Sequence, residues 1–177
     1  MPCKTPFEGD LAERAYQEGL ITDDDWFGRE DLLRKASEQG TPIGLVIDLV
    51  NTEKYYKGFV DGFGGVQYRK LRIKGKMLPD WSLMEQAFTI IDNFAKRRPN
   101  QYVAVHCTLG DNRTGYLVAA YLMWRGHYTT ARKAVTTFEK ARGHKLTRKQ
   151  LLYSLVHLES EPLEQQLHLQ KQLQRQQ

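Results

Sequence analysis

The chain has 177 residues, of which 41% are hydrophobic and 27% charged, and its formal net charge is +5. This length and composition indicate one soluble globular domain, and no run of about 18 apolar residues is present that would form a transmembrane helix. With only two cysteines, a disulfide framework and a cysteine-rich zinc site are excluded as well.

Residues 1–40 form an acidic segment that we expect to pack on the domain. Residues 1–31 contain nine acidic and three basic residues, which gives −6 and leaves +11 for the rest of the chain. The basic remainder favours polyanionic partners such as nucleic acid or phosphate esters, and a merely solvated basic surface is the alternative. The opening sequence MPCKTPFEGD lacks the apolar run of a signal peptide, so we expect a protein of the nucleus or cytoplasm.

Residues 41–160 alternate between strand and helix patterns. Strands are predicted over 44–50, 66–73 and 102–107, and helices over 81–97, 113–125, 129–141 and 147–158. The helix over 113–125 is apolar on nearly every side and should be central. This alternation predicts a single α/β domain with a central, mainly parallel sheet flanked by helices. The glutamine-rich residues 161–177 are expected to be a frayed helix or disordered.

The stretch HCTLGDNRTG, residues 106–115, has the pattern of an anion site with a nucleophile. Cys107 ends an apolar strand, and after a loop that Gly110 allows to curl tightly, Arg113 begins a helix. The N–H groups of such a loop and the helix dipole stabilise a thiolate, and the guanidinium of Arg113 suits two phosphoryl oxygens. These parts favour phosphoryl transfer to sulfur over a core cysteine beside a surface arginine.

Three segments of the chain resemble a known family. HCTLGDNRTG is similar to the HCTxGxNRTG signature of the cysteine-dependent RNA 5′-triphosphatases, within the dual-specificity phosphatase superfamily. That family includes the triphosphatase domain of metazoan mRNA-capping enzyme, the RNA/RNP-complex phosphatase and baculovirus phosphatase. IDLVNTEKYY (47–56) resembles its IDLxNTxxYY segment, and FEKARGHK (138–145) resembles a run in the free-standing and viral members. The resemblance covers about residues 42–158 and implies a cysteine-phosphatase fold that uses neither metal nor cofactor.

The resemblance implies that Cys107 is the nucleophile and that Arg113 clamps the transition state. It also implies that the rest of the loop and one later arginine contact substrate, with Thr114 assisting the sulfur and His106 positioning the loop. These substrate-binding candidates are His106, Thr108, Leu109, Gly110, Asp111, Asn112, Thr114 and Arg142.

Two loop positions depart from the family pattern, which usually has histidine at Leu109 and a neutral residue at Asp111. Leu109 removes a polar group from the expected pocket wall. The carboxylate of Asp111 either repels substrate or points outward, where Arg142 is a candidate partner. Both departures bear on catalytic efficiency more than on the type of reaction.

The chemistry of the leaving group separates two substrate classes. A phosphotyrosine leaving group has a pKa of about 10 and benefits from a general acid, whereas a β-phosphate with a pKa of about 6 does not need one. The candidate general acids are Asp80 and Asp61. Asp80 is more simply explained as the N-cap of the helix over 81–97. Because few residues could serve as a general acid, the sequence favours a phosphoanhydride substrate.

We therefore expect a monomeric enzyme that removes the γ and also the β phosphate from tri- or diphosphorylated RNA 5′ ends, with RNA and RNA-processing proteins as partners. Five bases in VQYRKLRIKGK fit a polyanion: Arg69, Lys70, Arg72, Lys74 and Lys76. Two alternatives stay open. One is an atypical dual-specificity protein phosphatase that uses Asp80, and the other is an RNA-5′-end-binding module in which Asp111 has impaired turnover.

Overall fold

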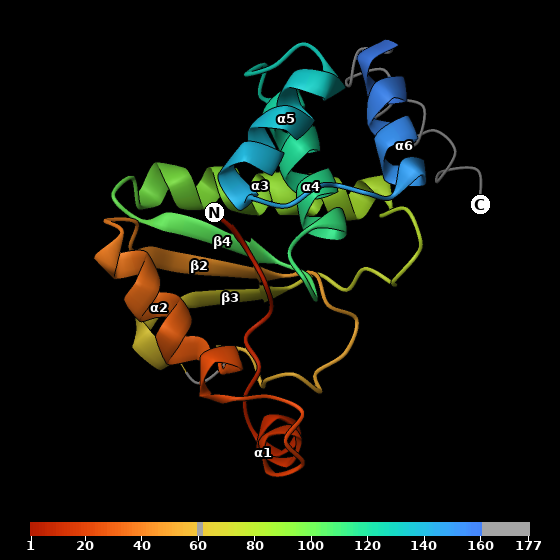
Figure 1. Cartoon of the computed structure of the whole chain (residues 1–177). Coiled ribbons are helices and arrows are strands. Elements are labelled where there is room, and N and C mark those ends of the chain that lie inside the picture. The colour runs from red at the N-terminus through yellow and green to blue at the C-terminus, as the bar shows by residue number, and fades with distance from the viewer. Residues whose placement is uncertain (60–61, 161–177) are drawn as a thin grey trace, which may run out of the picture.

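The centre of the molecule is a sheet of four parallel strands, seen in a computed structural model that describes residues 1–59 and 62–160 (Figure 1). The strands are β1 (Pro2–Cys3), β2 (Ile43–Asp48), β3 (Gln67–Lys70) and β4 (Tyr102–His106), in the order β1-β4-β2-β3. In the register, Asp48 of β2 lies opposite both His106 of β4 and Lys70 of β3. The three predicted strands are confirmed, and each ends earlier than predicted because the apolar pattern continues into buried residues beyond the ladder.

The described residues form six α-helices. They are α1 (Asp10–Gln17), α2 (Arg29–Glu38), α3 (Trp81–Arg97), α4 (Asn112–Trp124), α5 (Ala131–Arg142) and α6 (Lys149–Ser160), and short 3-10 turns occupy Asp23–Asp25 and Phe63–Gly65. Helices α3 to α6 lie on one side of the sheet and α2 on the other (Figure 1). The predicted single-domain α/β fold with its parallel sheet is confirmed, and the four predicted helices agree with α3 to α6 within two residues at their ends.

Alternation along the strands divides the core into two layers. Leu45, Ile47 and Val105 face the layer of α3 to α6, whereas Val46 and Ala104 face the layer of α2. Helix α4 is central, as its all-round apolar pattern predicts. The end of β4 and the start of α4 are therefore both fixed by buried packing, which positions the loop between them.

The N-terminal segment adds the edge strand β1 and then turns away from the sheet. Cys3 pairs with His106, and an isolated antiparallel bridge joins Phe7 to Phe27. Glu8 forms an ion pair with Arg29 at 2.5 Å. Of the helices in the described part of the chain, none is both long and apolar enough to cross a membrane. The tail predicted to be frayed or disordered, residues 161–177, lies outside the described residues.

Candidate active site

The loop of residues 107–113, called here the Cys107 loop, connects β4 to α4 at the carboxyl end of the sheet. Cys107 follows β4 directly and is only 4% exposed. Gly110 has φ +79°, a left-handed conformation that side chains other than glycine rarely adopt, so the predicted tight curl is present. The loop thereby brings the thiol, several peptide groups and the N-terminus of α4 into one small region.

The backbone donors of the loop are available to an anion. Within the described ranges 1–59 and 62–160, no protein acceptor pairs with the N–H groups of residues 108–111. Buried or half-buried N–H groups are rarely left without a partner in folded proteins. Such a run of free donors, next to the positive end of the α4 dipole, suits a bound oxyanion.

Arg113 is buried and held in place by three hydrogen bonds. Its Nη1 donates to the carbonyl oxygens of Leu49 (3.2 Å) and Ile73 (2.9 Å), and its Nη2 donates to Oγ1 of Thr108 (2.9 Å). Leu49 follows β2 and Ile73 follows β3, so the guanidinium is anchored to the ends of two strands. This anchoring presents a planar cation to the same region as the loop donors.

Thr114 provides a hydroxyl in the interior of the site. Its side chain is fully buried, and Oγ1 has no hydrogen-bond partner among the described residues. Leaving a buried hydroxyl without a partner costs about 1–3 kcal/mol. A group in this state suits the expected hydrogen bond to the sulfur of Cys107, which remains a prediction.

His106 lies behind the loop and is closed to substrate, contrary to its place among the substrate-binding candidates. Its side chain is fully buried, and its Nε2 lies 2.6 Å from the hydroxyl of Tyr56. Its Nδ1 faces two acceptors, the carbonyl oxygen of Cys107 at 3.4 Å and Oδ1 of Asp48 at 3.8 Å. Burial lowers the pKa of His106 to about 4 and outweighs the nearby Asp48, which raises it. The neutral ring therefore carries its proton on Nδ1 and accepts from Tyr56.

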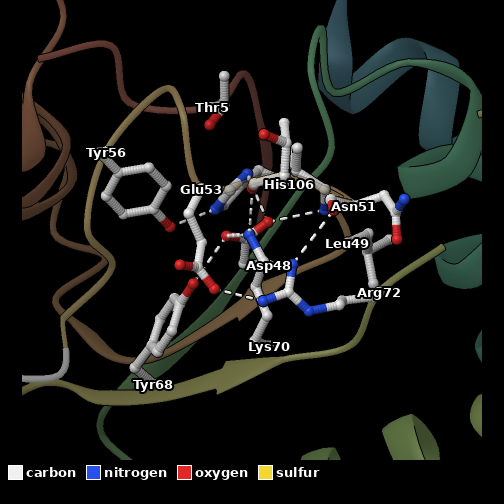
Figure 2. Close-up of polar contacts among 12 residues, drawn as sticks. Thr5, Asp48, Leu49, Asn51, Glu53, Tyr56, Tyr68, Lys70, Arg72 and His106 are labelled. Carbon is white, nitrogen blue, oxygen red and sulfur yellow. Dashed lines mark hydrogen bonds and ion pairs between the residues drawn. The ribbon is translucent and has the colours of Figure 1, made fainter. Parts of the chain in front are cut away.

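A buried polar cluster continues from His106 to β3 (Figure 2). Asp48 accepts hydrogen bonds from Lys70 Nζ at 2.6 Å and from the hydroxyl of Tyr68 at 2.7 Å, and Lys70 also donates to the Thr52 carbonyl oxygen at 2.8 Å. Burial, followed by the charge of Asp48, raises the pKa of Tyr68. Lys70 is thus part of an internal ion pair. This corrects the interpretation that Lys70 is available to bind a polyanion.

Sequence reasoning did not identify this cluster as a unit. The available signal was an aspartate, Asp48, at the end of an apolar strand, since a buried carboxylate requires a partner. Arg72 is also engaged: it donates to the Asn51 carbonyl oxygen at 3.1 Å and forms an ion pair with Glu53. Figure 2 shows this pair of Arg72 and Glu53.

The remaining loop residues contact α5, its following turn and the start of α6. Leu109 is 65% exposed, and Nη2 of Arg142 donates to its carbonyl oxygen at 2.7 Å. Asp111 lies beside Arg142 and His144. Oδ1 of Asn112 accepts from the backbone N–H groups of Thr147 (3.0 Å) and Arg148 (2.8 Å) at the start of α6. The side chains of Asn112 and Arg142 therefore hold the loop to α5 and to the start of α6, and their contact with substrate remains a prediction.

Of the two candidate acids, the structure describes Asp80. Asp80 occupies the N-cap position of α3 and is exposed, but its side chain makes no capping hydrogen bond, so the expected cap is wrong in that respect. Asp61 lies outside the described residues. In the described part of the chain, no group of three or more His, Cys, Asp or Glu side chains is arranged to hold a metal ion.

Comparisons with known proteins agree with this geometry. Residues 26–161 match the family described as dual specificity phosphatase, catalytic domain. The chain is 36% identical over 153 residues to a tyrosine-protein phosphatase of Autographa californica nuclear polyhedrosis virus, covering 86% of this chain and 85% of that protein. It is 37% identical over 162 residues to the RNA/RNP complex-1-interacting phosphatase homolog of Caenorhabditis elegans, covering 90% and 67%.

A second nematode relative is larger. The chain is 34% identical over 126 residues to the mRNA-capping enzyme of Caenorhabditis elegans, covering 68% of this chain but 19% of that protein. Among solved structures, a human tyrosine phosphatase-like serine/threonine/tyrosine-interacting protein superposes with a TM-score of 0.60 at 20% identity, covering 75% of this chain and 84% of the other. That likeness shows the fold alone. The family match and the viral and nematode relatives show that this chain belongs to the dual-specificity phosphatase family of cysteine-based phosphatases.

Proposed function

We propose that this phosphatase hydrolyses phosphoanhydride bonds at the 5′ end of tri- or diphosphorylated RNA, leaving a di- or monophosphate end. The observation that carries the proposal is that the described carboxylates near the Cys107 loop are engaged elsewhere. Asp48 is bonded to Lys70 and Tyr68, and Asp111 faces Arg142 and His144. A site in which these described carboxylates are engaged suits a leaving group that departs without protonation, as a β-phosphate does.

The reaction follows from the groups that converge on the loop. The thiolate of Cys107 attacks the terminal phosphorus, an S–P bond forms, and the bond to the bridging oxygen breaks, so that the shortened RNA departs with the electron pair. The free N–H groups of residues 108–111 and the guanidinium of Arg113 stabilise the three equatorial oxygens. Water then attacks phosphorus, the S–P bond breaks, and Thr114 stabilises the thiolate that leaves. Inorganic phosphate takes up the oxygen and both protons of the water and can then release one proton to solvent.

The loop after β3 supports a substrate with charge beyond the reacting phosphate. Lys74 and Lys76 are exposed and follow Ile73, whose carbonyl oxygen holds Arg113. Two exposed cations that follow this residue in the chain suit the further phosphates of a triphosphate end or an RNA backbone. The printed names of two relatives, an RNA/RNP complex-1-interacting phosphatase homolog and an mRNA-capping enzyme, also favour an RNA substrate. A partner among RNA-processing proteins is part of the same proposal.

The test is phosphate release from RNA labelled at the γ or β position, measured with EDTA present, beside turnover of a phosphotyrosine peptide. We expect the γ label to be released first, the β label to follow, and the RNA to be preferred over the peptide. A strong preference for the peptide would overturn the proposal in favour of a protein phosphatase. Tight binding of triphosphate RNA without release of either label would identify an RNA-end-binding module instead.

A further inference from the structure

Two consecutive carbonyl groups of the Cys107 loop are tied from its outer side. The backbone N–H of Thr5 donates to the carbonyl oxygen of Thr108 at 3.1 Å. Nη2 of Arg142, at the end of α5, donates to the carbonyl oxygen of Leu109 at 2.7 Å. The two tethers lie far apart in the sequence: Thr5 follows β1, and Arg142 ends α5. We call residues 1–6 the N-terminal strap.

Tying a carbonyl group also fixes the N–H group of the same peptide. A trans peptide is planar, and its C=O and N–H point in opposite directions. With the Thr108 carbonyl held outward by the strap, the N–H of Leu109 points to the other side of the loop. With the Leu109 carbonyl held outward by Arg142, the N–H of Gly110 does the same. These are two of the donors that have no protein acceptor among the described residues.

The strap also contacts the loop at Gly110. A Cβ atom built on Gly110 would collide with the carbonyl oxygen of Cys3, so the two backbones pass each other at a distance that only glycine permits. β1 itself is held against β4 through the pairing of Cys3 with His106, the residue before the nucleophile. The pairing of β1 with β4 therefore fixes the position of the strap relative to the loop.

We propose that the N-terminal strap and Arg142 are positioning elements of the anion site, which hold the Leu109 and Gly110 peptides with their N–H groups toward the bound phosphoryl group. Without the tethers, either peptide can rotate and present a carbonyl oxygen to the anion. Neither element touches the reacting atoms. The inference concerns the phosphatase site of the family and is independent of whether the substrate is RNA. It assigns a role to residues that precede the family match, which begins at residue 26.

Thr5→Pro is the direct test, because proline lacks the backbone N–H while its ring suits an extended segment. The matched control is Thr5→Val, which keeps the N–H and removes only the side-chain hydroxyl. Arg142→Met removes the second tether and keeps the length of the side chain. For each variant we would measure kcat and KM with triphosphate RNA, the inhibition constant for vanadate, and the Tm.

We expect Thr5→Pro and Arg142→Met each to lower kcat and to weaken vanadate binding by roughly tenfold, with a smaller change in KM. Thr5→Val should bind vanadate as the wild type does. In NMR spectra, vanadate should shift the amide protons of Leu109 and Gly110 in the wild type and less in the two variants. Because vanadate binding needs no RNA, the vanadate measurements test the positioning role even if the proposed RNA substrate is wrong.

The proposal is overturned if Thr5→Pro lowers the Tm while kcat and vanadate affinity stay at the wild-type level, since the strap would then serve packing alone. Should Thr5→Pro fail to fold, Arg142→Met decides the question, because Arg142 is partly exposed at a helix end. Unchanged vanadate affinity in Arg142→Met would refute the role of the second tether.

Discussion

Nε of Arg142 lies 3.7 Å from Oδ1 of Asp111, on the outer side of the Cys107 loop. Nδ1 of His144 lies at the same distance from that oxygen, which is buried and accepts no hydrogen bond among the described residues. The acidic residue that departs from the family pattern is therefore directed toward α5 and its following turn. Of the two expectations for Asp111, this geometry supports the outward, paired carboxylate.

The first prediction concerns Asp111→Asn. Because the carboxylate faces two basic side chains, its loss should leave KM for a phosphorylated substrate unchanged or raise it by a few-fold at most, as roughly 0.5–1 kcal/mol of pairing is removed. Steady-state kinetics at low and high salt provide the measurement. A KM that falls at low salt and recovers at high salt would show that the carboxylate repels the substrate after all.

The second prediction concerns Cys107→Ser. A serine hydroxyl is not ionised at neutral pH, so turnover should fall below about 1% of the wild-type rate. The Tm should change little, since one buried atom is replaced by a smaller one at the end of β4. Release of labelled phosphate and thermal unfolding are measured on the same preparation. Higher residual turnover would mean that another nucleophile performs the reaction.

The third prediction compares Arg113→Lys with Arg113→Ala. The guanidinium bonds three acceptors at once, two carbonyl oxygens and Oγ1 of Thr108, which the single ammonium of lysine cannot reproduce. Both variants should lose at least about a hundredfold in kcat, and both should be less stable by about 1–3 kcal/mol because the Leu49 and Ile73 carbonyl groups lose a partner. A mild lysine phenotype would show that only charge matters at this position.

The fourth prediction concerns the dependence of stability on pH. The pKa of buried His106 is about 4, below its ordinary value of 6.5, so between these values the unfolded chain binds more protons than the folded chain. The contribution of His106 to stability is therefore complete above pH 6.5 and is lost as pH falls from 6.5 to about 4. The total loss is roughly 3 kcal/mol at most.

His106→Asn is the control for this effect, because asparagine does not titrate. Urea unfolding at several pH values between 7 and 4.5 should give a shallower decline for this variant than for the wild type. Carboxylates that titrate in the same range are common to both proteins and cancel in the difference. Identical declines would contradict the assignment of a buried, neutral His106.

The fifth prediction separates the two substrate classes through Asp80→Asn. Asp80 is exposed and its side chain caps nothing, so the substitution should leave both the Tm and the release of γ-phosphate from RNA within about twofold of the wild type. A loss of ten times or more with either RNA or phosphopeptide would identify Asp80 as the general acid and favour the protein-phosphatase alternative.

The sequence by itself determined the order of strands and helices over residues 44–158 and the residues that make up the Cys107 loop, whereas β1, α1 and α2 were not predicted. Both are local properties, since hydrophobic periodicity predicts the elements and a strand, a glycine-containing loop and a helix start predict a cradle around Cys107 and Arg113. Element ends were less accurate, because residues such as Leu49 and Leu71 are buried beyond the ladder and continue the strand pattern.

Only the tertiary structure decided which side chains face the anion site and which support it from behind. The pairing of Lys70 with Asp48, the contact of Tyr56 with His106, and the hydrogen bond from Arg142 to Leu109 join residues 22, 50 and 33 positions apart. Such contacts depend on strand register and helix packing, which no local pattern encodes. For the same reason Thr5, at the far end of the chain, emerged as a partner of the loop only after β1 was placed beside β4.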